Sequence, residues 1–206
     1  MTIYLDIETG PSPRALEFEP PFEAPKNLKD PEKIRLAIEE KRADWNDRLA
    51  LSAVTGCILA VGLAIDSGPV EMISGETESE LLWRLWTRLA DPVSLTPRLC
   101  GWNLCGFDLP FLQRRNWVNK IPSPGWVFPR GRLSHVHRDL LREWCGENPG
   151  DRVPLDTVGK LFGLGGKTGS GADFARLWTE DRPQAVEYLR RDVELTRAVA
   201  LRMEGK

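Results

Sequence analysis

The segment Ile3-Tyr4-Leu5-Asp6-Ile7-Glu8, near the start of the chain, alternates between apolar and mainly polar side chains. In an extended chain the odd-numbered residues point to one side and the even-numbered residues to the other, so this period predicts a β-strand over residues 2–8. Thr9-Gly10-Pro11 ends the pattern. Asp6 and Glu8 therefore share one face of the strand, about 6.6 Å apart along its axis, while the other face is apolar.

This pair of carboxylates can be interpreted in two ways. In a partly buried strand, two neighbouring carboxylates repel each other and lose solvation, so the pKa of one should rise unless a cation lies between them. A divalent metal ion removes that conflict. The alternative is a strand whose second face is simply solvated, and the pair alone favours neither interpretation.

Length, composition and charge restrict the class of protein. A chain of 206 residues is long enough for one domain with a sizeable core and short for two, so we expect a single domain over residues 1–206. Hydrophobic residues make up 41% and charged residues 28%, which excludes disorder or coiled coil as a description of the whole chain. The formal net charge of −2 gives no overall attraction to a polyanion, so nucleic-acid binding must depend on local basic clusters and on metal ions.

The sequence also indicates a compartment. The N-terminus lacks the features of a signal peptide, and the longest apolar run, residues 57–65, is too short to span a bilayer. We therefore expect a cytoplasmic protein without a membrane partner, whose four cysteines are reduced.

The hydrophobic pattern predicts an α/β domain with a mixed sheet, because strands come first and helices dominate the end of the chain. After the first strand, further strands are predicted at 56–65, 70–73 and 99–103. Helices are predicted at 78–89, 109–118, 137–145, 155–162 and 182–202, with a long loop at 119–135.

The segment after the first strand has a different composition. Prolines and acidic residues at 12–30 are typical of a surface loop. Asp30-Pro31 then supplies an N-cap and a first-turn proline for a helix that ends near residue 51. We therefore expect a loop-helix insertion at about 11–51.

Three more candidate residues occur later in the chain. Asp108 follows a strand and a sharp turn at Gly106, which lets its carboxylate face outward at the end of the sheet. The common role of aspartate in that position is a helix N-cap, and both roles can coexist. Tyr188 and Asp192 are four residues apart, which places them on one face of the last helix. Such a pair, taken alone, is usually a surface feature.

Together these residues form a recognisable series. In chain order, Asp-x-Glu at 6–8, Asn-x-x-x-Phe-Asp at 103–108 and Tyr-x-x-x-Asp at 188–192 resemble the three exonuclease motifs of the DEDD superfamily. Tyrosine at 188 is similar to that of the tyrosine-type (DEDDy) subgroup. The resemblance extends from Ile3 to about Met203 and looks closest to stand-alone relatives of the exonuclease domain of family-B DNA polymerases. It implies a ribonuclease H-like fold, with a mixed central sheet flanked by helices.

The resemblance also implies an activity. Such an enzyme is a metal-dependent 3′-5′ exonuclease, which hydrolyses phosphodiester bonds from the 3′ end of single-stranded nucleic acid, with DNA as the expected strand. Two Mg²⁺ or Mn²⁺ ions suit a site made of oxygen ligands. The implied metal ligands are Asp6, Glu8, Asp108 and Asp192.

The resemblance also implies roles for these four ligands and for Tyr188. Asp6 would bridge both ions, and Glu8 and Asp192 would hold the ion that binds the attacking water. Asp108 would hold the other ion through water. Tyr188 would orient the attacking water, since a reference pKa of about 10 makes its hydroxyl a poor base at neutral pH.

A single strand also needs groups that bind its backbone and bases. Between the second and third motifs, basic residues are interspersed with Trp117, Trp126 and Phe128, a mixture that suits a single-strand groove; the alternative is a solvated loop whose aromatic residues belong to the core. The candidate nucleic-acid-binding residues are Thr9, Gly10, Asn103, Phe107, Arg114, Arg115 and Lys167. The expected partner is single-stranded nucleic acid with a free 3′ end, and the sequence indicates no particular protein partner.

Two other motifs point less clearly to a function. Gly166-Lys167-Thr168 resembles part of a phosphate-binding loop, but that motif needs glycine at 161, where the chain has leucine. His135, His137 and Cys145 are of the types that bind zinc, but a fourth ligand at regular spacing is missing.

Two alternatives to a DNA exonuclease remain. One is an exoribonuclease of the same fold, because no residue indicates selection for or against a 2′-hydroxyl. The other is a non-catalytic nucleic-acid-binding or partner-binding domain, which would be expected to lack one or more of the four carboxylates. All four are present.

Overall fold

The computed structural model describes residues 1–90, 97–129, 131–165 and 173–206. The chain forms two compact units, one of Met1–Glu8 with Ile58–Lys206 and the other of Thr9–Cys57. The second unit contains the insertion that the sequence predicts at 11–51.

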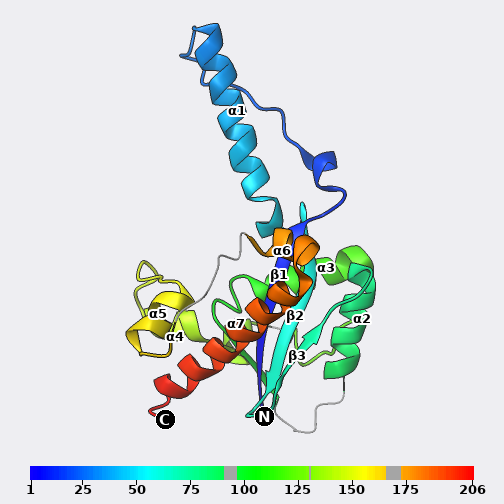
Figure 1. Cartoon of the computed structure of the whole chain (residues 1–206), viewed down its shortest axis with the longest axis vertical. Coiled ribbons are helices and arrows are strands. Elements are labelled where there is room, and N and C mark those ends of the chain that lie inside the picture. The colour runs from blue at the N-terminus through cyan, green and yellow to red at the C-terminus, as the bar shows by residue number, and fades with distance from the viewer. Residues whose placement is uncertain (91–96, 130, 166–172) are drawn as a thin grey trace. The chain divides into compact units, whose positions relative to one another are not determined.

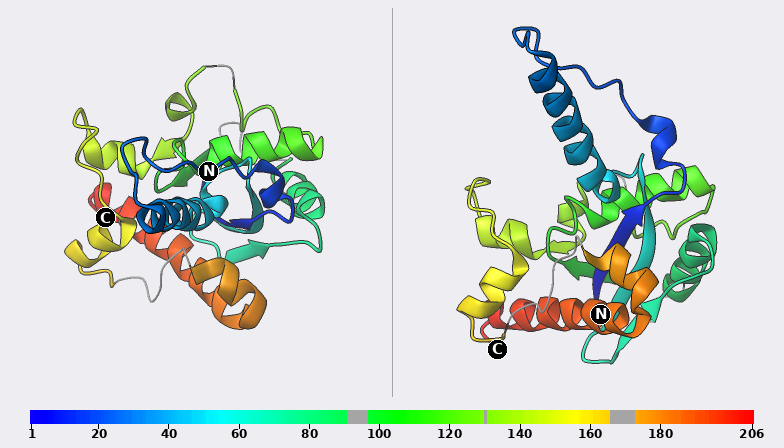
Figure 2. Two further views of the ribbon diagram at one scale, coloured as in Figure 1. Left: turned by 90° about the horizontal axis from the view of Figure 1, so that it is seen from above. Right: turned by 45° about the horizontal axis from the view of Figure 1, so that its top comes forward.

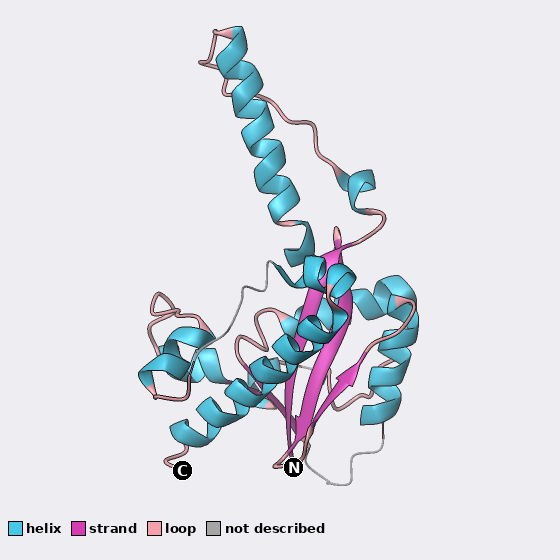
Figure 3. Cartoon of the chain, in the orientation of Figure 1, coloured by secondary structure: helices cyan, strands magenta, loops and turns pink. Residues whose placement is uncertain are grey.

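The larger unit is built on a mixed sheet. Its strands are β1 (Thr2–Pro11), β2 (Gly56–Ile65), β3 (Val70–Ile73), β4 (Arg98–Gly101) and β5 (Arg138–Asp139). They follow the order β3-β2-β1-β4-β5. Figure 1 labels β1, β2 and β3, and Figure 3 shows the strands in magenta. β4 pairs in parallel with both β1 and β5, whereas β2 and β3 are antiparallel. The mixed sheet expected from the sequence is therefore confirmed.

The long helix α7 (Arg182–Met203) covers one face of this sheet, and α3 (Asp108–Asn119) lies on the other (Figure 2). A Cβ atom on Gly62 would lie 2.7 Å from Cγ2 of Val193, so α7 lies directly against β2 and requires glycine there. Val193 shares a buried cluster with Tyr4 of β1. Because even-numbered residues of β1 share one side, the side chains of Asp6 and Glu8 face the α7 side of the sheet.

The helix α2 (Glu78–Leu89) begins and ends where the sequence predicts. Its buried side chains are Leu81, Leu82, Leu85, Trp86 and Leu89. Trp86 Nε1 donates to Asn116 Oδ1 of α3 over 2.7 Å, which joins the two helices. The apolar stripe at helical spacing is therefore the face by which α2 packs against the rest of this unit.

Two segments differ from the predictions in kind, and two elements differ in length: the first strand extends to Pro11 instead of ending at residue 8, and the helix that begins at Pro31 ends at Asp47 instead of near residue 51. The segment predicted as one helix at 137–145 is the short strand β5 followed by α4 (Leu140–Cys145). Asp139 caps α4, because its carboxylate accepts from the backbone N–H of Arg142. The sequence prediction also lacked α6 (Phe174–Glu180).

The remaining elements of the larger unit are α5 (Leu155–Leu161) and the 3₁₀ turn η3 (Leu133–His135). The long loop expected at 119–135 is thus largely correct. Within the part of the chain that the structure describes, every helix is too short or too polar to span a membrane.

The unit Thr9–Cys57 contains α1 (Pro31–Asp47) and two 3₁₀ turns, η1 (Ala15–Phe18) and η2 (Leu49–Leu51). Asp30 caps α1 as predicted, by accepting from the backbone N–H groups of the next turn. No residue of α1 is buried. Its contacts include one with the extended segment before it, where Phe22 packs edge-on against Trp45 at 6.1 Å between ring centroids.

Candidate active site

Three carboxylates from distant parts of the chain meet at the α7 side of the sheet. Asp6 and Glu8 come from β1, and Asp192 comes from the middle of α7. One carboxylate oxygen from each lies within 4.8 Å of the others. Glu8 and Asp192 are buried, and Asp6 is half-buried. The structure therefore brings together the first and third motifs predicted from the sequence.

Asp108 is joined to the same strand from the side. Its side chain is only 2% exposed, and Oδ1 accepts a hydrogen bond from the backbone N–H of Ile7 over 3.1 Å. Burial raises the pKa of Asp108 well above its usual value, and the charge of Asp6 raises it further. Asp108 lies outside the group of three within 4.8 Å, but it acts electrostatically on that group.

This donor set fits a divalent cation. The ligand atoms are carboxylate oxygens, which hard cations such as Mg²⁺ and Mn²⁺ prefer. Carboxylates that are buried side by side are costly, because each loses solvation and they repel one another. Both effects, burial first and then the charge of Asp6, raise the pKa of the neighbouring Asp108. A bound cation would remove that repulsion. Asp6, Glu8 and Asp192 could hold it directly, with Asp108 next to them.

Tyr188 lies on α7, one helical turn before Asp192, so both side chains share a face of the helix. Its side chain is buried, and its ring packs against Phe174 of α6 at 6.0 Å between centroids. Phe174 in turn stacks on Trp178 at 5.4 Å. The sequence interpretation missed Phe174, although Phe174, Leu177 and Trp178 have the i, i+3, i+4 spacing of a helix.

A further buried carboxylate, Asp139, supports the loop of the second motif. Its Oδ2 accepts from the backbone N–H of Cys105 over 2.8 Å, and Oδ1 accepts from that of Arg142 over 3.2 Å. Asp139 also adds, after burial and Asp6, to the raised pKa of Asp108. It was not a candidate in the sequence, because only the folded chain brings β5 beside β4.

The loop between β4 and α3 is a tight turn that contains Asn103 and Phe107. Asn103 has a left-handed backbone with φ of 59°, and its carbonyl accepts from the backbone N–H groups of Gly106 and Phe107. A Cβ atom on Gly106 would lie 2.3 Å from Asn103 Oδ1, so a larger residue there would displace the Asn103 side chain. Phe107 packs against Phe111 at 5.5 Å between centroids. The turn therefore fixes the position of Asp108 at its end.

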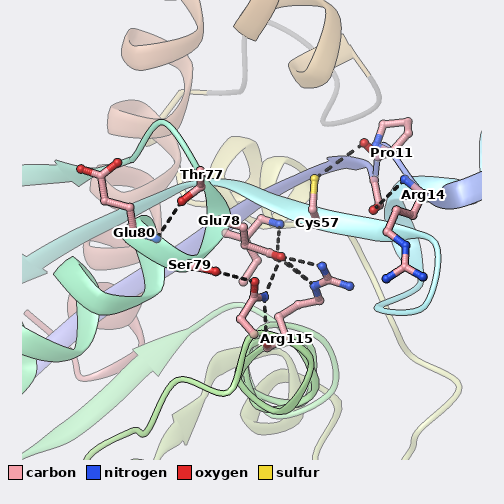
Figure 4. A network of polar contacts seen from close by, with 11 residues as sticks. Pro11, Arg14, Cys57, Thr77, Glu78, Ser79, Glu80 and Arg115 are labelled. Carbon is pink, nitrogen blue, oxygen red and sulfur yellow. Dashed lines mark hydrogen bonds and ion pairs between the residues drawn. The ribbon is translucent and has the colours of Figure 1, made fainter.

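Arg114 and Arg115, both predicted to bind nucleic acid, occupy different environments. Arg114 is exposed. The guanidinium of Arg115 is buried in an ion pair with Glu78, whose carboxylate also accepts from the backbone N–H of Ile58 and from Asn119 Nδ2 (Figure 4). This network joins β2, α2 and α3, which favours a structural role for Arg115.

The other predicted nucleic-acid-binding residues lie elsewhere. Thr9 and Gly10 belong to the unit Thr9–Cys57, where β1 continues. Lys167 lies outside the described residues, together with most of the glycine-rich run around it.

His137 is part of the interior. Its Nδ1 accepts from the backbone N–H of Leu99 over 3.2 Å, and its Nε2 donates to the carbonyl of Val127 over 2.9 Å. Burial lowers the pKa of His137, so the neutral ring is favoured. Among the described residues, no potential metal-binding group of three contains His135, His137 or Cys145.

Comparison with known proteins gives a family and a fold for the chain. The family described as "Predicted 3'-5' exonuclease related to the exonuclease domain of PolB" matches residues 54–205, a range that contains Asp108, Tyr188 and Asp192. A comparison with the curated proteins gives no match.

Among solved structures, the chain is similar to the "Structure of the family B DNA polymerase from the hyperthermophilic archaeon Pyrobaculum calidifontis", with 16% identity and a TM-score of 0.65. The similarity covers 98% of this chain and 24% of the polymerase chain, so this chain spans about a quarter of that protein. Similarity at this identity establishes the fold, and it confirms the ribonuclease H-like arrangement expected from the sequence. Since the family match extends over well more than half of the residues, the chain belongs to the family of predicted 3′-5′ exonucleases related to the exonuclease domain of PolB.

Proposed function

We propose that the protein is a tyrosine-type DEDD exonuclease that uses divalent metal ions to remove nucleotides from the 3′ end of single-stranded DNA. The observation that carries this proposal is the convergence of Asp6, Glu8 and Asp192, whose ligand atoms lie within 4.8 Å of one another. The family match supports a nuclease, and the order of the motifs along the chain supports the subgroup.

The proposed metal ions are two Mg²⁺ or Mn²⁺, held by the four carboxylates of the first, second and third motifs. When bound, such ions stabilise charge on the phosphoryl oxygens and lower the pKa of water. The protein's own contribution is to keep the carboxylates in place. The backbone N–H of Ile7 and the turn that begins at Asn103 hold Asp108 beside β1, and packing against β2 holds α7 and therefore Asp192.

Tyr188 is proposed to orient the attacking water through its hydroxyl oxygen. Its ring is fixed by Phe174, and its position one turn before Asp192 places it on the same helix face as that carboxylate. A phenol with a reference pKa of about 10 stays protonated at neutral pH, so it positions water rather than removing a proton.

The direction of digestion tests this proposal. Single strands of one DNA sequence, labelled at the 5′ or at the 3′ end, are incubated with Mg²⁺ or Mn²⁺. We expect the 5′-labelled strand to shorten one nucleotide at a time and the 3′-labelled strand to release a labelled mononucleotide at once. Excess chelator should stop both. Full activity in chelator, or shortening from the 5′ end, would contradict the proposal.

An RNA strand of the same sequence and a DNA duplex belong in the same experiment. Faster digestion of RNA than of DNA would favour an exoribonuclease of the same fold. Binding of the single strand without any product, at every metal concentration, would favour a non-catalytic binding domain.

A further inference from the structure

A hollow of about 360 Å³ lies beside the turn of the second motif, wholly within the larger unit. Its wall is formed by that turn, by α4 and by the loop that leads to α5. The wall includes Asn103, Gly106, Leu141, Arg142, Pro149 and Arg152. A hollow of this size is in the range of sites that bind small ligands or single groups of a larger one.

Arg152 is held at this hollow by Asn103. Its Nη2 donates to Asn103 Oδ1 over 2.8 Å, and that oxygen occupies the space beside the Cα of Gly106 that a Cβ atom would need. A guanidinium has five N–H donors in a planar fork, and Asn103 takes one of them among the described residues. Arg152 is exposed, so the rest of the fork can bind a group that enters the hollow.

Arg142 supplies a second guanidinium. Its side chain is 58% exposed, and its Nε lies 3.7 Å from Oδ2 of the buried Asp139. That distance is an ion pair without a short hydrogen bond, so Arg142 keeps donors for another partner. The same Asp139 carboxylate binds the backbone N–H of Cys105. One buried residue therefore fixes both the wall of the hollow and the loop that ends at Asp108.

The charged residues that line this hollow are all positive among the described residues. Among the described residues that line it, two are arginines and none is acidic. A larger hollow of about 620 Å³ lies by the first residues of β1 and carries both signs, with Asp66 and Glu204 beside Arg98 and Arg197. Of these two hollows, the one beside the second motif has charged lining residues of positive sign alone among the described residues, and it is linked to Asp108 through the turn.

Resting on the proposed function, we propose that Arg142 and Arg152 bind one internucleotide phosphate of the substrate strand, other than the phosphate that is cut. The planar fork of arginine matches two phosphate oxygens, and a charge-assisted pair of this kind is strong. Contacts to phosphate position a strand without reading its bases. The site therefore holds strands of any sequence in register with the carboxylates.

Binding without hydrolysis tests this inference. Anisotropy of a 5′-labelled single-stranded DNA 12-mer is measured in chelator at several salt concentrations. The proteins are the full-length wild type, Arg152→Ala, and the double variant Arg142→Ala with Arg152→Ala. Arg84→Ala is the matched control, because the Arg84 side chain is also 58% exposed but lies on α2.

We expect Kd to rise about tenfold in the double variant, since hydrogen bonds to charged groups are among the stronger polar contacts. The slope of log K against log salt should become shallower by about 0.7, the change for one phosphate on a single strand. Arg152→Lys with Arg142→Lys should recover part of the affinity, because lysine keeps the charge but not the fork. Arg84→Ala should match the wild type. A double variant whose Kd and slope equal those of Arg84→Ala would overturn the inference.

Strands with a single neutral methylphosphonate linkage locate the phosphate. In the wild type, a neutral linkage at one position near the 3′ end should raise Kd. In Arg152→Ala, the strand with that neutral linkage and the unmodified strand should have the same Kd. The same losses at every linkage in both proteins would exclude a phosphate contact of Arg152. A protein that binds in this way but never shortens a strand would contradict the proposed exonuclease and leave the phosphate site intact.

Discussion

The backbone N–H of Ile7 donates to Oδ1 of Asp108 over 3.1 Å, which joins residues 101 positions apart in the sequence. Ile7 lies between Asp6 and Glu8, so this hydrogen bond fixes the second motif to the first. The same hydrogen bond partly compensates the buried Asp108 carboxylate for the solvation that it loses in the interior. Asp108 is therefore both a structural acceptor and a candidate metal ligand.

The first prediction follows from the raised pKa of Asp108, caused first by burial and then by Asp6. As pH rises above the ordinary value of 3.8, the unfolded chain loses its proton before the folded protein does. The contribution of Asp108 to stability is thus complete below that pH and is lost as pH rises through the folded pKa. Asn in this position keeps the acceptor for Ile7 and cannot ionise.

Urea unfolding in chelator, from pH 4 to pH 8, checks the predicted pH dependence of the Asp108 contribution to stability. The free energy of unfolding of Asp108→Asn relative to the wild type should increase steadily with pH. A difference that stays constant over the range would mean that Asp108 does not titrate in the fold as described.

The second prediction separates two neighbouring arginines. Arg115→Met leaves Glu78 buried without its cation, so the free energy of unfolding should fall by about 3–5 kcal/mol. Arg114→Met, at an exposed position, should change it by less than about 0.5 kcal/mol. Chemical denaturation measures both. If Arg115→Met is as stable as Arg114→Met but binds single strands poorly, Arg115 is a nucleic-acid ligand rather than a structural residue.

The third prediction concerns the two histidines. Burial lowers the pKa of His137 from its usual 6.5, so the unfolded chain takes up a proton first as pH falls. The stability contributed by neutral His137 is present above that pH and is lost as pH falls towards the folded pKa. Between pH 7.5 and 5.5 the free energy of unfolding of His135→Gln should keep a constant difference from that of the wild type. His137→Gln should start from a lower value, and its difference from the wild type should become smaller as pH falls. Equal pH slopes in both variants would exclude this role of His137.

Much of this arrangement follows from local patterns in the sequence. The alternation at 3–8 predicts β1, and the i, i+3, i+4 spacing predicts α2 to the residue, because each pattern depends on which face is buried. The motif residues Asp6, Glu8 and Asp192 were expected together, and the structure brings them within 4.8 Å.

The features that were missed depend on tertiary contacts. β5 has two residues, too few for a periodic pattern, and it exists because it pairs with β4. Asp139 becomes important only through the backbone of Cys105, far from it in sequence. Which arginine of the pair 114–115 is buried depends on the side of α3 that faces α2, and the identity of Glu78 as its partner appears only in the fold.

The fourth prediction isolates the hydroxyl of Tyr188. Tyr188→Phe keeps the ring contact with Phe174, so the fold should be unchanged. If the hydroxyl orients water, turnover should fall by about 10²- to 10⁴-fold while metal affinity stays the same. Tyr4→Phe is the matched control, because Tyr4 is the other tyrosine and is equally buried. Wild-type turnover in Tyr188→Phe would remove the hydroxyl from the mechanism and direct attention to His135.

The proposed function makes the carboxylates of β1 and α7 the metal-dependent site of a 3′-5′ exonuclease. Its most direct test is a time course on a 5′-labelled single strand with Mn²⁺ or Mg²⁺, for the wild type, Asp6→Asn and Asp192→Asn. We expect a ladder that shortens from the 3′ end for the wild type and none for either variant. Both variants should melt in chelator at the wild-type temperature or above it, because each loses a repelling charge. Wild-type laddering by either variant, or a large loss of metal-free stability with activity retained, would show that these carboxylates are not the catalytic metal ligands.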